Sequence, residues 1–343
     1  MKTVVIHGPR DLRIEERGVG SLAAGEVLVD VRSGGICGSD MHYYNHGGFG
    51  AVRLKEPMIL GHEVSGVIAA VAADVTKVKV GDKVAVNPSR PCRRCQYCLE
   101  GLPNQCLNMR FYGSAMPMPH IQGAFRQQLV CDAIQCEATT SDIDFGLLAM
   151  AEPFSVGLHA TSRLGPLVGR RALITGCGPI GTLAIAALRH HGIAEIVATD
   201  VIGGPLARAR KIGADRTINV AETPDELAAY SANKGYFDVL IECSGNEKAL
   251  RSALDCLRPR ATIVQLGLGG DISIPVNVLV AKELSMIGSF RFHPEFALAV
   301  KLISERRVDL SPVLTATYPL SDAVAAFDAA NDRQHNMKVQ IAF

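Results

Sequence analysis

The chain has 343 residues, of which 48% are hydrophobic and 20% are charged, and its formal net charge is +1. This length predicts two domains, and the composition is that of a globular protein rather than a disordered one. The nearly neutral charge argues against nucleic acid or an anionic membrane surface as the main partner.

The N-terminal stretch MKTVVIHGPRDLRIEER carries charges at once and lacks the apolar core of a signal peptide. The longest apolar run, Ala172 to Leu188, is broken by glycines and a proline, so no segment is typical of a membrane span. Ten cysteines without a secretory signal favour a reducing cytoplasm and metal binding over disulfides. We therefore expect a cytoplasmic protein.

The first 150 residues or so are predicted to be rich in β-strands. Short β-branched segments bounded by Gly, Asp or Pro occur at Val27–Val31, Val64–Val71 and Lys83–Val86. Gly81–Asp82 is typical of a turn before the last of these strands.

Two fragments in this region carry candidate metal ligands, Cys37 in GICGSDMH and His62–Glu63 in GHE. Singly, each signal is weak, because a lone histidine is more often a surface or core residue than a ligand. Together they offer a thiolate, an imidazole and a carboxylate, the set that a catalytic zinc with one open position requires. A later fragment, AEP, places a further acid, Glu152, just before the next domain.

Four cysteines lie in one short window, NPSRPCRRCQYCLEGLPNQC. Their spacing supplies the four thiolates of a closed structural zinc site, formed by Cys92, Cys95, Cys98 and Cys106. Two disulfides would need an oxidising compartment, and an iron–sulfur run would have its fourth cysteine sooner and followed by proline, not by Leu107. A nucleic-acid zinc ribbon would need a basic field that the chain lacks.

From Arg170 the pattern alternates strand, glycine turn and helix, which predicts a parallel sheet covered by helices on both faces. Predicted strands are RRALITG, EIVATD, FDVLIECSG and ATIVQLG, and predicted helices are PIGTLAIAALRHHG, PLARARKIGA and KALRSALDCL. The last 60 residues or so mix two helices, HPEFALAVKLISERR and SDAVAAFDAAND, with a closing strand, KVQIAF.

The first strand and helix of this region enclose a GxGxxG motif. Its glycines permit a tight turn, close approach of a pyrophosphate and close helix packing, with the phosphates facing the helix N-terminus. The motif is Gly176, Cys177, Gly178, Pro179, Ile180 and Gly181.

The next strand ends in Asp200, whose carboxylate would accept hydrogen bonds from the ribose hydroxyls of NAD and repel the extra phosphate of NADP. No arginine follows within the next four residues, so we predict NAD rather than NADP. In the alternative interpretation the glycines only make a turn and Asp200 only caps the next helix.

The order of these motifs resembles the zinc-dependent medium-chain alcohol and polyol dehydrogenases, and the resemblance spans essentially the whole chain. It implies an α/β fold with a GroES-like β-rich catalytic domain and a Rossmann doubly wound parallel-sheet domain. The expected limits are 1–150 for the catalytic domain, with a cysteine lobe at about 88–110, and 151–288 for the Rossmann domain. Residues 289–343 are expected to return to the catalytic domain.

The resemblance also implies the ligands of a catalytic zinc. Cys37 and His62 match zinc ligands, and Glu63 matches the third ligand of polyol dehydrogenases. Glu152 takes the place of a cysteine in simple alcohol dehydrogenases and would bind zinc directly or through water. The sequence leaves the choice between the two acids open.

Three neighbouring residues match proton-handling positions of the family. Ser39 matches the hydroxyl that receives the substrate's proton, His42 the base that carries it toward solvent, and Asp40 the partner that would fix the His62 tautomer. The plain alternative is a turn at Ser39–Asp40 and a surface side chain at His42.

Within the family, YYNHGGFG and LKEPMILGHE are similar to sorbitol-type enzymes, whereas NPSRPC, NQCLNMRFYGSAM and GSFRF are closer to bacterial enzymes acting on the sugar acid L-idonate. The expected reaction is oxidation of L-idonate to 5-keto-D-gluconate, with hydride transfer to NAD. The alternatives are a sorbitol, xylitol or threonine dehydrogenase. A zinc-free reductase would lack GHE and the cysteine lobe, and a non-catalytic nucleotide sensor would not need the ligand set.

Tyr43, Phe111 and Tyr112 are candidates to line the cleft, and Arg110 and Arg291 to bind a substrate carboxylate. Either arginine could instead form a surface ion pair or anchor Glu152. By resemblance the protein is expected to form a homodimer or homotetramer through the edges of its nucleotide-domain sheets. The stretch VQLGLGGDISIPV, with the apolar segment that follows, is a candidate edge.

Overall fold

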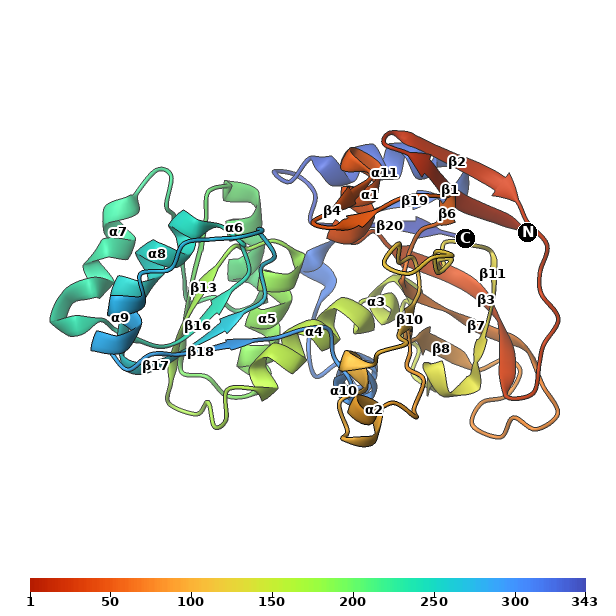
Figure 1. Ribbon diagram of the computed structural model, residues 1–343, viewed down its shortest axis with the longest axis horizontal. Coiled ribbons are helices and arrows are strands. Elements are labelled where there is room, and N and C mark those ends of the chain that lie inside the picture. The colour runs from red at the N-terminus through yellow and green to blue at the C-terminus, as the bar shows by residue number, and fades with distance from the viewer.

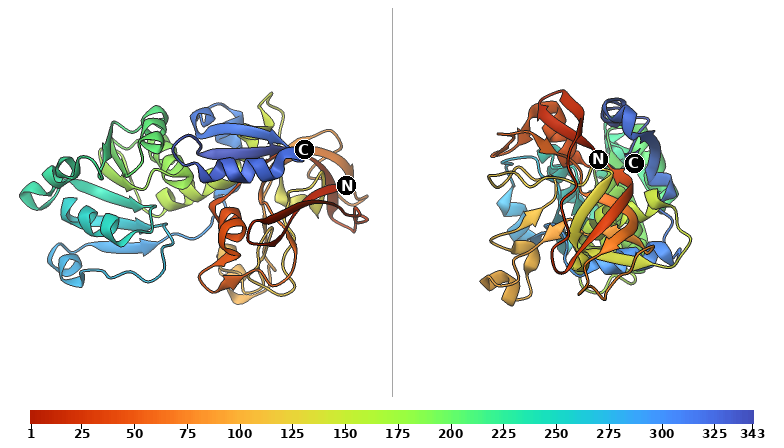
Figure 2. Two further views of the ribbon diagram at one scale, coloured as in Figure 1. Left: turned by 90° about the horizontal axis from the view of Figure 1, so that it is seen from above. Right: turned by 90° about the vertical axis from the view of Figure 1, so that its right-hand side faces the viewer.

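A computed structural model describes residues 1–343 and shows two lobes joined at a narrow waist (Figures 1 and 2). Both chain ends lie in the same lobe, which also holds the first third of the chain. The middle of the chain forms the other lobe. None of the helices combines the length and apolarity needed to cross a membrane.

The lobe with the chain ends is built on a seven-stranded sheet in the order β12-β8-β7-β3-β20-β19, with β11 also paired to β3. Its strands are β3 (Glu26–Gly35), β7 (Glu63–Val71), β8 (Lys83–Val86), β11 (Gln128–Asp132), β12 (Cys136–Thr139), β19 (Leu314–Pro319) and β20 (Lys338–Ala342). A smaller sheet contains β1 (Lys2–Gly8), β2 (Asp11–Glu16) and β6 (Met58–Ile59). The C-terminal strand β20 pairs with both β3 and β19, so the tail completes this sheet.

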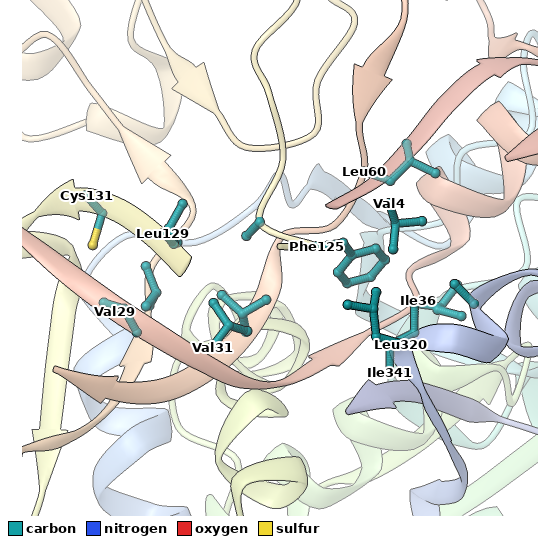
Figure 3. Packing of buried hydrophobic residues seen from close by; sticks show 14 of the residues in the cluster. Val4, Val29, Val31, Ile36, Leu60, Phe125, Leu129, Cys131, Leu320 and Ile341 are labelled. Atoms are coloured by element: carbon teal, nitrogen blue, oxygen red, sulfur yellow. The ribbon is translucent and has the colours of Figure 1, made fainter. Parts of the chain in front are cut away.

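Alternating apolar side chains of these strands form one core, shown in Figure 3. Phe125 lies near its centre, fully buried, with its ring close to those of Phe327 and Phe343. Val4 and Leu60 approach it from the N-terminal side, and residues from the C-terminal tail approach it from the other. One continuous core therefore holds the two ends of the sequence together.

Short elements surround this sheet. They are α1 (Gly38–His46), β4 (Gly48–Phe49), β5 (Val52–Arg53), β9 (Ser89–Arg90), α2 (Gln96–Leu99), β10 (Arg110–Phe111), α3 (Phe145–Ala149) and α11 (Ala323–Asn331), with 3₁₀ turns at Pro103–Gln105, Ala133–Gln135, Ser311–Val313 and Leu320–Asp322. The helix α1 was not expected from the sequence, where a turn at Ser39–Asp40 was the plain alternative to a functional role.

The second lobe is a six-stranded parallel sheet in the order β15-β14-β13-β16-β17-β18. Its strands are β13 (Arg171–Thr175), β14 (Glu195–Asp200), β15 (Arg216–Asn219), β16 (Phe237–Glu242), β17 (Leu257–Gln265) and β18 (Ser285–Gly288). Its helices are α5 (Pro179–His190), α6 (Gly203–Ile212), α7 (Pro224–Ala228), α8 (Glu247–Cys256) and α9 (Val276–Ala281), with a 3₁₀ segment at Ala229–Lys234. The order reverses beside β13, the switch point at which such sheets bind nucleotides.

The predicted alternation of strands and helices is confirmed, but the predicted sheet edge is wrong. Val264 and Gln265 belong to β17, which is paired on both sides, and residues 266–275 form no strand. The edge strand on that side is β18, which follows α9. An apolar run signals burial but does not show which strand lies outermost, because that depends on pairing.

Two helices span the junction between the lobes, α4 (Ala151–Ser162) and α10 (Glu295–Ser304). They pack on each other, and α4 also packs on α5 of the parallel sheet. Their shared core includes Phe154, Phe296 and Leu183. The lobes therefore meet through a packed apolar junction, and Glu152 lies in the first turn of α4, facing the catalytic lobe.

We expect Phe125→Ala to lower the free energy of unfolding by about 3–5 kcal/mol, because it removes a fully buried ring and leaves a cavity. Denaturant unfolding followed by circular dichroism measures the change. Val168→Ala, at a side chain that is 82% exposed, is the control and should stay within about 0.5 kcal/mol of the parent. Similar unfolding midpoints for the wild-type protein, Phe125→Ala and Val168→Ala would contradict the central position of Phe125 in the core.

Candidate active site and metal centres

The Asp40 carboxylate joins the two segments that carry the candidate ligands. One oxygen accepts the backbone N–H of Cys37 at 3.0 Å, and the other accepts the backbone N–H of Gly61 at 3.2 Å. Asp40 is fully buried and is the third residue of α1, and Cys37 is the residue that caps the start of this helix. The two side chains each accept from the other residue's backbone, which is the arrangement called a capping box. The sequence thus places Cys37 at a helix start and fixes it beside Gly61 and His62, the two residues before β7.

Gly61 is required at this junction because its backbone is left-handed, with φ +89°, and an added Cβ would fall on the ring of Phe125. The next residue, His62, is 4% exposed, and its Nδ1 has no hydrogen-bond partner. Asp40 Oδ1 lies 3.9 Å from that nitrogen, too far for a hydrogen bond. The expectation that Asp40 fixes the His62 tautomer by direct hydrogen bonding is therefore wrong. Its carboxylate instead holds the backbone on either side.

One atom each from Cys37, His62 and Glu63 lie within 4.8 Å of one another, and Glu152 is not part of this group. Both Glu63 oxygens also accept from the Lys338 ammonium, at 2.7 and 2.8 Å. A carboxylate has about four lone-pair directions, so this pairing leaves Glu63 able to bind a cation. The three side chains thus offer one sulfur, one nitrogen and one oxygen ligand close together in the catalytic lobe.

Burial makes these groups resist ionisation. It raises the pKa of Cys37 to about 12, with a further contribution from the Glu63 carboxylate, and raises the pKa of Glu152 to about 8. The charges of His62 and Lys338 act in the opposite direction on Glu152. A divalent cation would offset the same desolvation by taking the place of the thiol proton.

The residues present fit a zinc ion. Sulfur, imidazole and carboxylate are zinc ligands, three protein ligands leave an open position, and the orphaned Nδ1 of buried His62 lies beside an anion. Cys37, His62 and Glu63 would hold the metal, and Glu152 is near enough for their charges to influence its pKa.

The residues predicted to handle protons lie on α1, directly after Cys37. Ser39 is half-buried in the first turn, and His42 is exposed one turn later, with its ring 5.5 Å from that of Phe49. Although the residue is exposed overall, partial desolvation of its ring and the neighbouring His46 lower the pKa of His42 below its usual value. His42 is therefore neutral at pH 7, the form that accepts a proton.

The aromatic candidates divide between the site and the core. The ring of Phe111 lies 5.3 Å from that of His62, and the buried Tyr43 hydroxyl accepts the backbone N–H of Ala115 at 3.0 Å. Tyr112 instead packs against the catalytic-lobe core, with its hydroxyl 3.2 Å from Gln135 Oε1. The strand β10 ends at Phe111 and a turn begins at Tyr112, so the two neighbouring rings lie in different surroundings.

The two candidate arginines also have different environments. Arg110 is exposed on β10, opposite Arg90, and has no contact with the proposed ligands. Arg291 stacks on the faces of Phe111 and Phe290, 4.3 and 4.8 Å from their centroids. Burial lowers the pKa of Arg291, whereas the nearby Glu152 and Tyr43 raise it. Of the two, Arg291 is the one beside the site.

The cysteine lobe forms the second candidate metal centre. Cys95 Sγ lies 3.6 Å from Cys98 Sγ and 4.0 Å from Cys106 Sγ, and all four sulfurs lie within 4.8 Å of one another. Sulfurs arranged tetrahedrally about 2.3 Å from zinc would be about 3.8 Å apart, so the cluster has the dimensions of a closed site. Backbone N–H groups, first that of Arg94, lower the pKa of Cys92 to about 6, which favours its thiolate.

The glycine motif lies at the switch point of the parallel sheet. Gly176 is left-handed, with φ +84°, and nothing lies within 4 Å of a Cβ built at Gly178, the cap of α5. Asp200 accepts the backbone N–H groups of Cys177 and Val201, each at 2.7 Å. An open surface at the helix N-terminus beside a carboxylate fits a dinucleotide, with its pyrophosphate over Gly178 and its ribose near Asp200.

Two buried charged residues near these sites carry no recognisable motif in the sequence. Lys338 begins the closing strand β20 and is 1% exposed; a lysine in an apolar strand was its only signal. Glu242 ends β16 and accepts from Ser244 N at 2.8 Å and Gln265 Nε2 at 2.6 Å, which ties together the strand ends under the nucleotide site. Neither role could be read from spacing, because both depend on contacts between distant strands.

Comparison with known proteins decides the family. Residues 23–140 match the alcohol dehydrogenase GroES-like domain, and residues 179–305 match the zinc-binding dehydrogenase family. L-idonate 5-dehydrogenase (NAD(P)⁺) of Escherichia coli K12 is 39% identical over 343 residues, covering 100% of this chain and 98% of that protein. The chain belongs to the zinc-dependent medium-chain dehydrogenases.

A solved structure and a further relative support the same family. The crystal structure of L-idonate 5-dehydrogenase from E. coli K-12 superimposes with a TM-score of 0.95, covering 100% of this chain and 98% of that one. Sorbitol dehydrogenase of Gallus gallus is 33% identical over 342 residues, covering 98% of this chain and 95% of that protein. The family resemblance and the fold class expected from the sequence are both confirmed.

The two metal centres predict two zinc ions per chain. Cys37→Ser should lose the catalytic ion and retain the other, and Cys98→Ser should do the reverse, as measured by elemental analysis of purified protein. Because zinc must displace the thiol proton of Cys37, whose pKa is raised to about 12, zinc added to metal-free enzyme at pH 7 should release protons into weakly buffered solution. A single wild-type ion that disappears with Cys37→Ser would show that the cysteine lobe is not a metal site.

Removal of the Asp200 carboxylate should shift cofactor choice. We expect Asp200→Ala to lower kcat/KM for NAD by about 10–100-fold, the range for loss of charge-assisted hydrogen bonds, and to lower it less for NADP. Asp200→Asn, which keeps an acceptor for Cys177 N–H, separates the charge from its structural role. Equal losses with both cofactors in both variants would contradict ribose recognition by Asp200.

Proposed function

We propose that the enzyme oxidises a secondary alcohol of a sugar acid with transfer of hydride to NAD, and that L-idonate, converted to 5-keto-D-gluconate, is its substrate. The observation that carries the choice of a sugar acid is Arg291. Its guanidinium lies over the faces of the Phe111 and Phe290 rings, near Glu152 and Tyr43, but forms no ion pair or hydrogen bond with a carboxylate. A guanidinium with no ion-pair partner in the chain suits a substrate carboxylate, which it can bind through two oxygens.

The proposed roles follow from position. Zinc, when bound, acts as a Lewis acid that lowers the pKa of the substrate alcohol, and NAD accepts the hydride. Ser39, half-buried next to the ligands, receives the alcohol proton, and His42, exposed on the same helix, passes it to solvent. Tyr43 and Phe111 form a wall beside the ligands. The packed helices α4 and α10 hold the two lobes at a fixed relative position, which aligns substrate and cofactor.

Glu63 is proposed as the third zinc ligand, since it is grouped with Cys37 and His62, and Glu152 as a neighbouring acid that would bind the metal directly or through water. Lys338 holds the Glu63 carboxyl group in place through hydrogen bonds to both of its oxygens.

A polyol dehydrogenase acting on sorbitol or xylitol is the second candidate. It is favoured by the similarity of the sorbitol dehydrogenases and by the acid pair Glu63 and Glu152. The two candidates differ in whether the substrate carries a carboxylate, which makes Arg291 the residue that separates them.

The domain limits are proposed as 1–150 with 289–343 for the catalytic domain and 151–288 for the Rossmann domain. We also propose a homodimer or homotetramer in which β18 edges pair, supported by the exposed apolar residues Val276 and Val280 on the neighbouring α9, 61% and 72% exposed. A cytoplasmic location is supported by ten free cysteines.

Arg291→Ala should raise KM for L-idonate by about 10–100-fold, because it removes a charge-assisted bidentate contact. KM for sorbitol should change by no more than about threefold, as measured by NADH formation. The matched control is Arg110→Ala, an exposed arginine on the adjoining strand β10, which should leave both values near the parent's. Equal effects of Arg291→Ala on both substrates would rule out recognition of the carboxylate.

A further inference from the structure

A cavity adjoins the candidate active site and lies between the cysteine lobe and the segment that connects β18 to α10. Its volume is about 350 Å³, near the lower limit of small-molecule pockets, which span roughly 300–1,000 Å³. Its lining includes Asn104, Cys106, Leu107, Phe111, Phe290 and Arg291. One wall therefore comes from the metal lobe and the other from residues 289–292, here called the crossing segment.

A hydrogen bond connects the two walls. Asn104 Nδ2 donates to the carbonyl oxygen of Phe290 at 3.1 Å, and Asn104 belongs to the 3₁₀ turn between the third and fourth cysteines. The next residue of the crossing segment, Arg291, has a left-handed backbone with φ 56°. A non-glycine residue keeps this conformation only when its surroundings hold it, and the bond to the preceding carbonyl does so.

The side chain of Arg291 is held from the same direction. Phe111 ends β10, the strand that follows the fourth cysteine, and its ring centroid lies 4.3 Å from the guanidinium carbon and 5.3 Å from the His62 ring. Met116 Sδ contacts Arg291 Nη2 at 3.9 Å. No protein oxygen accepts a hydrogen bond from the guanidinium, so its other N–H groups are available to a ligand.

We propose that this cavity binds the carboxylate end of the sugar-acid substrate and that the cysteine lobe determines specificity by holding Arg291 in place through Asn104 and Phe111. This inference rests on the proposed function, since it assumes an anionic substrate. Asn104 is a positioning residue, acting through the backbone of the crossing segment. The lobe with the closed metal site thus contributes to recognition at the open one, although its sulfur ligands take no part in the reaction.

The test is a double-mutant cycle between Asn104→Ala and Arg291→Ala. Asn104→Ala alone should raise KM for L-idonate by about 3–10-fold, as expected for the loss of one hydrogen bond, while its effect on KM for sorbitol and for NAD stays within about twofold. In the Arg291→Ala background the same change should have no further effect on L-idonate. The control Gln96→Ala removes an exposed amide from the same lobe that does not line the cavity.

Binding without turnover provides a second measurement. L-idonate is titrated calorimetrically into the enzyme–NADH complex, which cannot turn over because it contains no hydride acceptor. The dissociation constant for L-idonate should rise in Asn104→Ala and in Phe111→Leu. The second variant keeps an apolar side chain but removes the ring. Metal content at two ions per chain in both variants shows that the lobe is intact.

The outcomes separate the inference from the proposed function. Wild-type enzyme that prefers sorbitol to L-idonate would overturn both. Wild-type enzyme that prefers L-idonate, with equal losses for the two substrates in Asn104→Ala or additive losses in the double mutant, would overturn only the role of the lobe. A raised KM for NAD in Asn104→Ala would show that Arg291 recognises the cofactor instead.

Discussion

The two hydrogen bonds of the buried Asp40 carboxylate are the contact on which the proposed catalytic site depends. They join Cys37, at the start of α1, to Gly61, which directly precedes His62 and β7, so both bonds lie at or next to a candidate ligand. Cys37 and His62 are far apart in the sequence, and neither segment alone fixes a distance between them. Because the carboxylate binds backbone rather than side chains, the ligand atoms of Cys37 and His62 stay free for a cation.

Charge balance is the second constraint at the same place. A thiol, an imidazole and the carboxyl groups of Asp40, Glu63 and Glu152 are buried together, and burial raises the pKa of Cys37, Asp40 and Glu152. Lys338, contributed by the last strand of the chain, supplies one positive charge to Glu63. With a divalent cation at the site, the cation, Lys338 and Arg291 carry four positive charges, which match the Cys37 thiolate and the carboxylates of Asp40, Glu63 and Glu152, so an anionic substrate can approach without strong repulsion.

The junction between the lobes brings the remaining parts together. The packed helices α4 and α10 set the catalytic lobe against the nucleotide sheet, and α4 carries Glu152 into the site. The crossing segment runs from the edge strand β18 into α10 and presents Arg291 to the cleft. Contact with Asn104 and Phe111 makes the position of this arginine depend on the cysteine lobe. Recognition of the substrate would then draw on both lobes and on both metal centres.

The sequence by itself determined the local chemistry: the zinc-type spacing of four cysteines, the GxGxxG turn with Asp200, the alternating strands and helices, and the family to which these motifs belong. These signals are short-range, and each survives in the linear order of residues. Only the tertiary structure decided that Glu63 rather than Glu152 groups with Cys37 and His62, that Asp40 holds backbone and not the imidazole, and that Arg291 rather than Arg110 faces the site. The reason is that each of these choices depends on which distant strands and loops meet, and on which face of a strand a side chain occupies, neither of which residue spacing specifies.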